Sequence, residues 1–201
     1  MNVILDYDVG NLDSVKRGFE RVGINSIVTK DPTLIENADS LILPGVGAFN
    51  EAMKSLKKSG LIPLIKSHIE NNKPLLGICL GMQLLYEASE ENGFSEGLGF
   101  LKGTIKPLKI SQKVPHMGWN QLVFNNESHP LLKYIKANDY VYFVHSYYVE
   151  SDFKDVVAYA EYDIKVPAIV AQGNIYATQF HPEKSAQVGL NILKAYGEMI
   201  K

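Results

Sequence analysis

The chain has 201 residues, of which 46% are hydrophobic and 21% charged, so it is long and apolar enough to bury the core of one globular domain. This composition excludes an intrinsically disordered or fibrous chain. The 20 Lys and Arg residues nearly balance the 22 Asp and Glu residues, and the formal net charge of -2 gives no electrostatic footprint for binding nucleic acid.

The first residues, MNVILD, predict a strand and not a targeting segment. They contain no basic region, and their apolar run stops at Asp6 after three residues. No run approaches the roughly eighteen continuous apolar residues that cross a bilayer. Cys79 is the only cysteine, which excludes an intrachain disulfide and a cysteine-based metal cluster. We therefore expect a cytoplasmic protein without a metal site or a cofactor.

The first half of the chain alternates short apolar runs with longer amphipathic ones. Strands are predicted at 3–5, 24–29, 40–43 and 75–78, and helices at 12–22, 48–58, 61–71 and 80–89. In the helix at 12–22, apolar residues recur at helical spacing opposite a basic and acidic side, so this helix is expected to cover one face of a sheet. The alternation is typical of an α/β fold with a parallel sheet.

After about residue 92 the pattern changes to short β-rich runs broken by Gly, Pro, Asn and Asp. Strands are expected at 99–108, 121–124, 139–145, 156–161, 168–172 and 175–180, and a helix at 188–200. Such runs favour hairpins and antiparallel additions to the sheet. The sequence contains no internal repeat, low-complexity segment or linker, so one domain over 1–201 is predicted.

The sole cysteine lies between two glycines, where an apolar strand gives way to a helical pattern. The segment 77–81 reads GICLG, a cysteine version of the nucleophile elbow. A reversal from strand to helix in so few residues demands a strained backbone, and the small residues Gly77 and Gly81 allow other backbone to approach closely. The turn is expected to aim the sulfur of Cys79 out of the carboxyl edge of the sheet, at a helix N-terminus that favours a thiolate.

A cysteine nucleophile needs a base, and the base needs an acceptor that orients it. Of the five histidines, His68 on a helix surface and His129 before a proline are expected to be solvated. His181 ends the apolar run 175–180 and is followed by Pro182 and Glu183. In an extended segment residues i and i+2 lie on one side, so Glu183 is expected to reach one imidazole nitrogen while the other faces Cys79.

Acyl transfer from a cysteine also needs N–H donors aimed at the developing oxyanion. The segment 41–47, LILPGVG, ends a strand with two glycines whose backbone can turn inward, and the residue after Cys79 supplies another N–H. The N–H groups of this segment and of Leu80 are therefore candidate oxyanion donors.

Together these motifs resemble the class I, or triad, glutamine amidotransferases. Within that superfamily the segments VGNL at 9–12, GVG at 45–47, VPHMGWN at 114–120, YFVHSY at 142–147 and FHPEKS at 180–185 resemble the family of glutaminase subunits of imidazole glycerol phosphate synthase. The likeness runs from about residue 3 to the C-terminus. Related glutaminases of other pathways share the elbow and His-Pro-Glu, so the PHMGWN block decides the subfamily.

The resemblance implies a flavodoxin-like, three-layer α/β glutaminase fold and the hydrolysis of L-glutamine to glutamate and ammonia. Cys79 would form a γ-glutamyl thioester, His181 would act as base and then as acid, and Glu183 would orient His181. The same likeness implies the oxyanion role of Gly45, Val46 and Leu80. It also implies a glutamine-binding set: Gly47, Gln83, Glu91, Ser146 and Tyr147.

The resemblance further implies a heterodimer with a (β/α)8-barrel cyclase subunit that receives the ammonia in histidine biosynthesis. Trp119, Asn120, Tyr142 and Lys184 fall where that family meets its partner. An exposed Trp beside Asn suits an interface anchor, although Trp119 as a core residue is the alternative. No nucleic acid or membrane partner is implied.

One departure from the family is Asp8, where glycine is usual. If the backbone there needs a positive φ, Asp adopts it at a cost. Asp8 is also the one hint of a paralogous glutaminase that feeds another synthase, such as one for surface-polysaccharide sugar amidation.

Three further hypotheses about the function stay open. A cysteine hydrolase of γ-glutamyl peptides would share the Cys-His pair, and the PHMGWN block argues against it. A flavodoxin-like cofactor binder is disfavoured by the acids Asp6 and Asp8 in the loop that would hold phosphate. A non-catalytic scaffold subunit would not need Cys79, His181 and Glu183 together.

Overall fold

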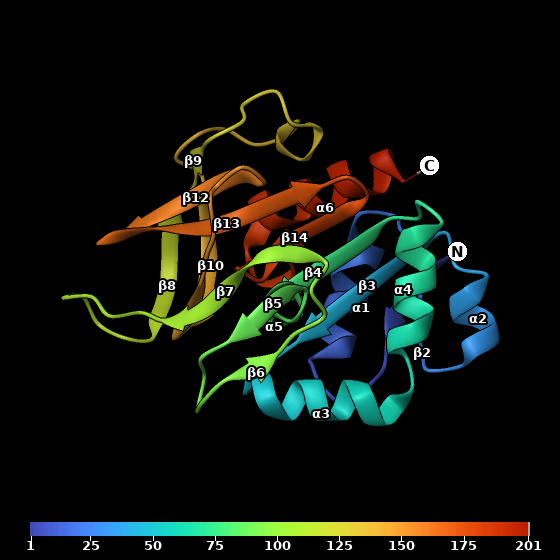
Figure 1. The fold of residues 1–201 in the computed structure, drawn as a ribbon. Coiled ribbons are helices and arrows are strands. Elements are labelled where there is room, and N and C mark those ends of the chain that lie inside the picture. The colour runs from blue at the N-terminus through green and yellow to red at the C-terminus, as the bar shows by residue number, and fades with distance from the viewer. Residues whose placement is uncertain (201) are drawn as a thin grey trace.

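A large mixed sheet forms the centre of the computed structural model, which describes residues 1–200 (Figure 1). Its eight strands follow the order β2-β1-β3-β4-β14-β13-β12-β9. The strands from β2 to β14 run parallel, and β13, β12 and β9 continue the sheet antiparallel. The bounds are β1 Asn2–Leu5, β2 Ser26–Thr29, β3 Ser40–Gly45, β4 Leu75–Cys79, β9 Val123–Phe124, β12 Val156–Tyr162, β13 Ile164–Gln172 and β14 Ile175–Thr178. The expected α/β class, with antiparallel additions in the C-terminal half, is confirmed.

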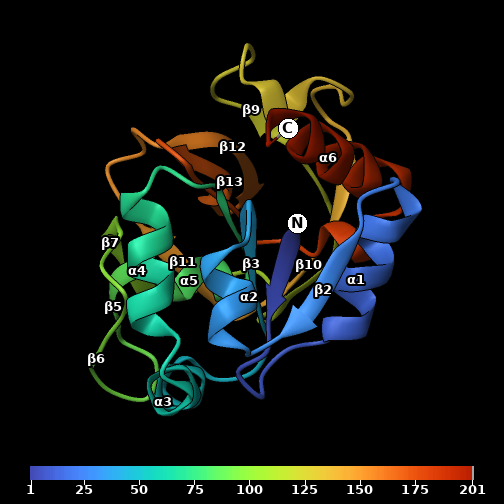
Figure 2. The ribbon, with the colours of Figure 1, turned by 90° about the vertical axis from the view of Figure 1, so that its right-hand side faces the viewer.

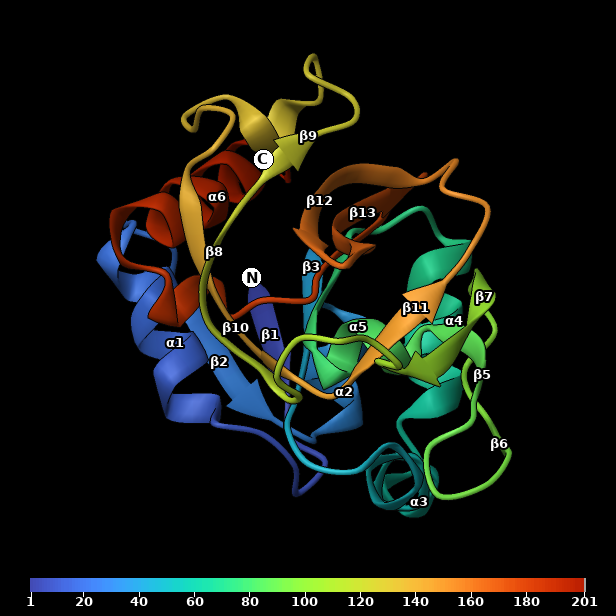
Figure 3. The same ribbon diagram turned by 90° about the vertical axis from the view of Figure 1, so that its left-hand side faces the viewer.

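Helices cover both faces of this sheet, as the end-on views show (Figures 2 and 3). One face carries α1 (Leu12–Arg21) and α6 (Ala186–Met199), and the other carries α2 (Pro32–Glu36), α3 (Phe49–Ser59), α4 (Ile62–Glu70) and α5 (Leu80–Leu84). Alternate residues of a strand point to opposite faces. In β1, accordingly, Val3 and Leu5 lie in the core under α2 to α5, whereas Ile4 lies in the core under α1 and α6.

Two small sheets extend the molecule beyond the central layers. A four-stranded sheet has the order β11-β7-β5-β6, and an antiparallel ribbon pairs β10 with β8. Their bounds are β5 Tyr86–Ser89, β6 Ser95–Glu96, β7 Leu101–Pro107, β8 His116–Gln121, β10 Tyr140–His145 and β11 Tyr147–Glu150. Two single 3-10 turns, η1 (Pro130–Leu132) and η2 (Pro182–Lys184), complete the fold.

Three sequence predictions about local structure are wrong. The helix expected at 80–89 ends at Leu84, because Tyr86–Ser89 forms strand β5, which pairs parallel with β7 across an irregularity and antiparallel with β6. The strand expected at 175–180 ends at Thr178, so His181 lies beyond the strand and not at its end. His68 is buried and not solvated, since its Nε2 is 2.9 Å from the carbonyl oxygen of Pro74.

In residues 1–200 no helix is long and apolar enough to span a bilayer.

A tight contact between α5 and β3 explains the glycine at position 81. A Cβ at this position would lie 1.8 Å from the carbonyl oxygen of Leu43 in β3, a distance that only backbone displacement can relieve. The expectation that the glycines around Cys79 permit close backbone approach is therefore confirmed. The contact locks the start of α5 against the end of β3.

We predict that Gly81→Ala lowers the free energy of unfolding by about 3 kcal/mol or more, because the added methyl overlaps backbone that cannot rotate away. Chemical denaturation monitored by circular dichroism measures the change. Gly60→Ala is the control: Gly60 ends α3 with φ 73° and has nothing within 4 Å of its Cβ position, so only a left-handed backbone cost of about 1 kcal/mol is expected. Equal losses in the two variants would contradict the steric explanation.

Candidate active site

Cys79 stands at the turn between β4 and α5, at the carboxyl edge of the parallel strands. Its backbone is left-handed, with φ 55° and ψ -112°, and the next residue, Leu80, begins the helix. A non-glycine residue in this region is strained and persists only where packing over-determines it. The strand-to-helix elbow expected from the sequence is therefore present, with Cys79 at its apex, although α5 is much shorter than expected.

Glu183 holds one nitrogen of the His181 ring. The distance from Nδ1 of His181 to Oε1 of Glu183 is 2.8 Å, and the Glu183 side chain is only 2% exposed. The contact was expected from an extended segment, but Pro182–Lys184 forms the 3-10 turn η2, which brings the carboxylate back under the ring. Gly18 of α1 makes room for it, since a Cβ there would lie 3.0 Å from Cβ of Glu183.

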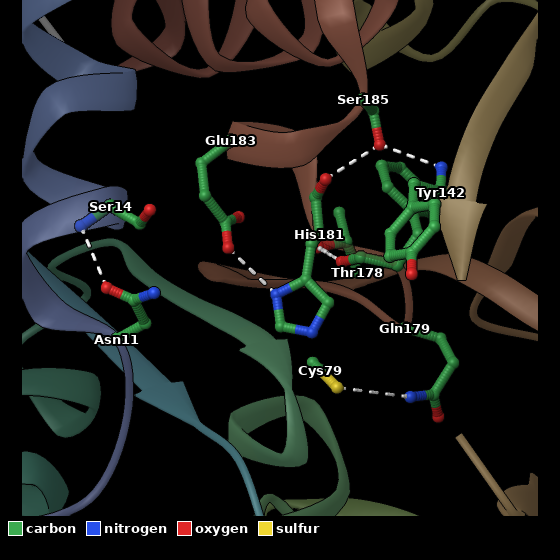
Figure 4. Close-up of polar contacts among 10 residues, drawn as sticks. Asn11, Ser14, Cys79, Tyr142, Thr178, Gln179, His181, Glu183 and Ser185 are labelled. Carbon is green, nitrogen blue, oxygen red and sulfur yellow. Dashed lines mark hydrogen bonds and ion pairs between the residues drawn. The ribbon is translucent and has the colours of Figure 1, made fainter. Parts of the chain in front are cut away.

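The other side of the ring faces the sulfur of Cys79 (Figure 4). The backbone of His181 is fixed by the neighbouring strand β10: its N–H donates to the carbonyl of Tyr142 at 3.1 Å. Ser185 also links His181 to β10, because its Oγ donates to the His181 carbonyl at 2.6 Å and accepts from the Tyr142 N–H at 2.9 Å. Ser185 is thus a supporting residue that sequence reasoning did not single out.

The protonation state of His181 follows from these contacts. Burial lowers the pKa of the imidazole, but the hydrogen bonds and charges of Cys79 and Glu183 outweigh burial and raise the pKa of His181 to about 9. The ring is consequently mostly protonated at neutral pH. An imidazolium in this place can stabilise a thiolate and can deliver a proton to a leaving group.

A pocket of about 350 Å³ opens in front of the sulfur. It gathers residues that lie far apart in the sequence: they come from the ends of β4 and β10, from α5 and β11, and from the segments that adjoin β3, β5, β8 and β14. All five residues of the expected glutamine-binding set line it. The full lining is Val46, Gly47, Cys79, Leu80, Gln83, Glu91, Pro115, Val144, His145, Ser146, Tyr147 and His181.

The expected oxyanion donors lie beside Cys79. Gly45 ends β3 directly opposite Cys79 in the parallel register, and Val46, 42% exposed, and Leu80 line the pocket. The buried Tyr7, which the sequence did not single out, donates its hydroxyl to the carbonyl of Pro44 at 2.5 Å. This hydrogen bond fixes the peptide group between Pro44 and Gly45.

Two of the expected glutamine-binding side chains already have protein partners. Oε2 of Glu91 accepts from the backbone N–H of Phe49 at 2.8 Å. Nε2 of Gln83 donates to the carbonyl of Tyr147 at 3.1 Å and to Oε1 of Gln179 at 2.9 Å. Gln179 in turn directs Nε2 toward the sulfur of Cys79 at 4.0 Å (Figure 4). Gln179 is fully buried, and the sequence alone gave no reason to notice it.

The four expected interface residues do not enter the pocket. Trp119 on β8 is 52% exposed and packs edge-on against Tyr142 of β10, with ring centroids 6.0 Å apart. This exposure contradicts the alternative that Trp119 is a core residue. Asn120 faces the other side of β8, and Lys184 is exposed at the end of η2.

Asp8 has φ 65°, so the loop after β1 does require a left-handed residue at this position. Its N–H donates to Oδ1 of Asp6 at 3.2 Å, an Asx-type contact that stabilises the turn. Aspartate therefore adopts at this position the left-handed backbone that favours glycine.

The family described as glutamine amidotransferase class-I matches residues 3–195 of this chain. The imidazole glycerol phosphate synthase subunit HisH of Caldanaerobacter subterraneus subsp. tengcongensis is 52% identical over 199 residues, which cover 98% of each chain. The protein of the same name from Geobacillus sp. (strain WCH70) is 49% identical over 205 residues, covering 98% of this chain and 96% of that protein.

Solved structures show the same fold at low sequence identity. The structure of PurLQS from Thermotoga maritima is 18% identical, with a TM-score of 0.79, and covers 100% of this chain and 98% of that one. A crystal structure of a glutamine amidotransferase is 20% identical, with a TM-score of 0.75, and covers 97% of this chain and 98% of that one.

We predict that Glu183→Gln lowers the pKa of His181 by about one pH unit or more, because the amide keeps the acceptor oxygen but removes the negative charge. NMR titration of histidine-labelled protein measures the midpoint, which is expected near pH 9 in the unchanged protein and lower in the variant. Glu198→Gln serves as the control, since Glu198 pairs with Lys133 on the surface. An unchanged midpoint in Glu183→Gln would contradict the role of the carboxylate.

Proposed function

The chain belongs to the class I glutamine amidotransferases, and we propose that it is the glutaminase subunit of an imidazole glycerol phosphate synthase. One observation carries the proposal. The strained Cys79 and the buried imidazole of His181 line one pocket, and the buried carboxylate of Glu183 bonds to the Nδ1 of that imidazole. Near 50% identity over almost the whole chain to the two HisH proteins supports the choice of subfamily.

In the proposed reaction the sulfur of Cys79 attacks the γ-carboxamide carbon of L-glutamine. The oxyanion that forms is stabilised by backbone N–H groups at Gly45, Val46 and Leu80. The protonated His181 gives its proton to the amide nitrogen, the C–N bond breaks, and ammonia leaves behind a γ-glutamyl thioester. The neutral imidazole then takes a proton from water, the hydroxyl adds to the thioester carbon, and glutamate and the free Cys79 return.

Glutamine itself carries an ammonium and a carboxylate that the pocket must recognise. Glu91 is the acid among the lining residues, so we assign the ammonium group to it. Gly47, Gln83, Ser146 and Tyr147 complete the binding set: Gly47 brings backbone groups, Gln83 a side-chain amide, and Ser146 and Tyr147 hydroxyl groups. These assignments rest on their common location and on the resemblance of their motifs.

The ammonia needs a protected route, because ammonia released into water at neutral pH becomes ammonium and loses its nucleophilic lone pair. Exposed apolar side chains adjoin the pocket: Met117 and Trp119 are 58% and 52% exposed on β8, and Val46 is 42% exposed at the pocket. A monomer rarely leaves such a set uncovered. We propose that a (β/α)8-barrel cyclase covers it, with Trp119, Tyr142 and Lys184 in the interface, whereas Asn120, which the resemblance also placed there, faces inward from β8.

The test is glutamate release from L-glutamine by the purified chain, alone and with the barrel cyclase and its nucleotide ligand. We expect strong stimulation by the barrel and ligand, and no release by Cys79→Ala under any condition. Vigorous hydrolysis without a partner would point to a free-standing hydrolase of the same fold. Activity that this barrel does not stimulate would favour a paralogous synthase as the client.

We predict that Trp119→Ala weakens binding of the barrel by about tenfold or more, since a large aromatic at the centre of an interface contributes a disproportionate share of the affinity. Titration calorimetry with the barrel measures the dissociation constant. Phe94→Ala is the matched control, because Phe94 is 76% exposed next to β6, away from the β8–β10 ribbon. Equal weakening by the two variants would place the interface elsewhere.

A further inference from the structure

Two buried histidines that the proposed reaction does not use form a hydrogen-bonded chain beside the pocket. Nδ1 of His145 lies 2.8 Å from the carbonyl oxygen of Tyr147. Nε2 of the same ring lies 2.9 Å from Nδ1 of His116. Nε2 of His116 lies 3.2 Å from Nδ2 of Asn120. The chain therefore joins β8 to the first residue of β11.

The end groups decide which atoms carry the protons. The Tyr147 carbonyl can only accept, so His145 must carry its proton on Nδ1, and its Nε2, bare in the neutral ring, must accept. His116 must then donate from Nδ1, which leaves its Nε2 to accept from the amide of Asn120. All three hydrogen bonds thus point in one direction, from Asn120 to Tyr147.

The orientation of the Asn120 amide agrees with this assignment. Its Nδ2 also donates to the carbonyl of Glu161 at 3.1 Å, and its Oδ1 accepts from the backbone N–H of Gln121 at 2.8 Å. An amide flipped by 180° would place two acceptors together at the Glu161 carbonyl and two donors together at the Gln121 N–H. The tautomer of each ring is consequently specified from both ends of the chain.

Burial keeps both rings neutral. His116 is 3% exposed and is sandwiched between Phe143 and Tyr162, with ring centroids 4.6 and 4.0 Å away and nearly parallel planes. Burial lowers the pKa of His116 to about 4. Burial and the neighbouring His116 and His181 lower the pKa of His145 to about 3, despite its bond to the Tyr147 carbonyl.

The Tyr147 end of the hydrogen-bonded chain contacts the glutamine side chains that lie next to the sulfur of Cys79. The Tyr147 carbonyl accepts from Gln83 as well as from His145, and Gln83 bonds to Gln179, whose amide faces the sulfur of Cys79. His145, Ser146 and Tyr147 all line the pocket. Whatever fixes the His145 ring therefore fixes the pocket wall formed by these three residues.

We propose that His116 is a positioning residue for glutamine binding: it holds His145 in the tautomer that anchors the Tyr147 carbonyl, and so sets the pocket wall at Ser146 and Tyr147. The kinetic consequence rests on the proposed glutaminase function, whereas the tautomer assignment does not. His116 itself does not line the pocket, so it acts on glutamine only through His145.

Two variants separate the hydrogen bond from the stacking. His116→Phe keeps a flat ring between Phe143 and Tyr162 but removes the donor to His145. His116→Asn places an amide N–H near the position of Nδ1 but loses most of the stacking. With the barrel and its ligand present, we expect KM for glutamine to rise about tenfold in the Phe variant, and about threefold at most in the Asn variant.

Thermal unfolding is expected to rank the two variants in the opposite order, with the lower Tm in His116→Asn, because stacking and not the hydrogen bond supports the ribbon. His129→Asn is the control, since His129 caps η1 outside the pocket and Asn also caps well, so its KM should not change. A Phe variant with normal KM and an impaired Asn variant would overturn the proposal and leave His116 a packing residue.

Long-range ¹H–¹⁵N spectra of labelled histidine give a readout that does not depend on activity. We expect both rings to be neutral and protonated on Nδ1 at pH 7, and we expect His145 to lose this single tautomer in His116→Phe but not in His116→Asn. A neutral ring protonated on Nε2 in the unchanged protein would contradict the proposed direction of the hydrogen-bonded chain from Asn120 to Tyr147. If the unchanged protein released no glutamate, the proposed function would fail, while these spectra would still decide the role of His116.

Discussion

The left-handed backbone of Cys79 is the constraint on which the rest of the site depends. A single non-glycine residue in this conformation costs on the order of 1–3 kcal/mol. The neighbours supply what keeps it there: β4 is paired in register with β3 on one side and with β14 on the other, and Gly81 brings the start of α5 against the Leu43 carbonyl. The elbow therefore cannot relax into an ordinary helix start without separating the central strands. The sulfur is presented at the sheet edge because the sheet is intact.

Three imidazoles lie near this elbow, and their surroundings favour the charged form of His181 and the neutral forms of His116 and His145. Glu183 and Cys79 raise the pKa of His181 to about 9, whereas burial without a carboxylate lowers the pKa of His116 and His145 to about 4 and 3. The charge on His181 itself disfavours a second charge on His145. His116 and His145 therefore stay neutral while the imidazolium of His181 pairs with Glu183.

Local sequence patterns predicted the parts of this site that local chemistry determines. The glycines at 77 and 81 predicted the elbow, and the proximity of Glu183 to His181 predicted their contact, although the 3-10 turn that makes it was not foreseen. The helix expected at 80–89 failed because apolar spacing does not distinguish a helix from Tyr86–Ser89 paired with a distant strand. Gln179 and Tyr7 were missed for the same reason, since their partners Gln83 and Pro44 are brought to them by tertiary packing. His68 was misjudged although its partner Pro74 is near in the sequence, because helical spacing alone did not show that its ring is buried.

The β8–β10 ribbon shows why the pair His116 and His145 could not be found from spacing alone. The two residues are 29 positions apart and meet only because the antiparallel register sets His145 opposite His116, just as it sets Tyr142 opposite Trp119. Alternate residues of β8 point to opposite sides, so Met117 and Trp119 are exposed while His116 and Asn120 turn inward to the hydrogen-bonded chain. A partner that packs on Trp119 therefore presses on the same strand that positions His145. One strand thus carries both the exposed face proposed for a partner and the inward residue that positions His145.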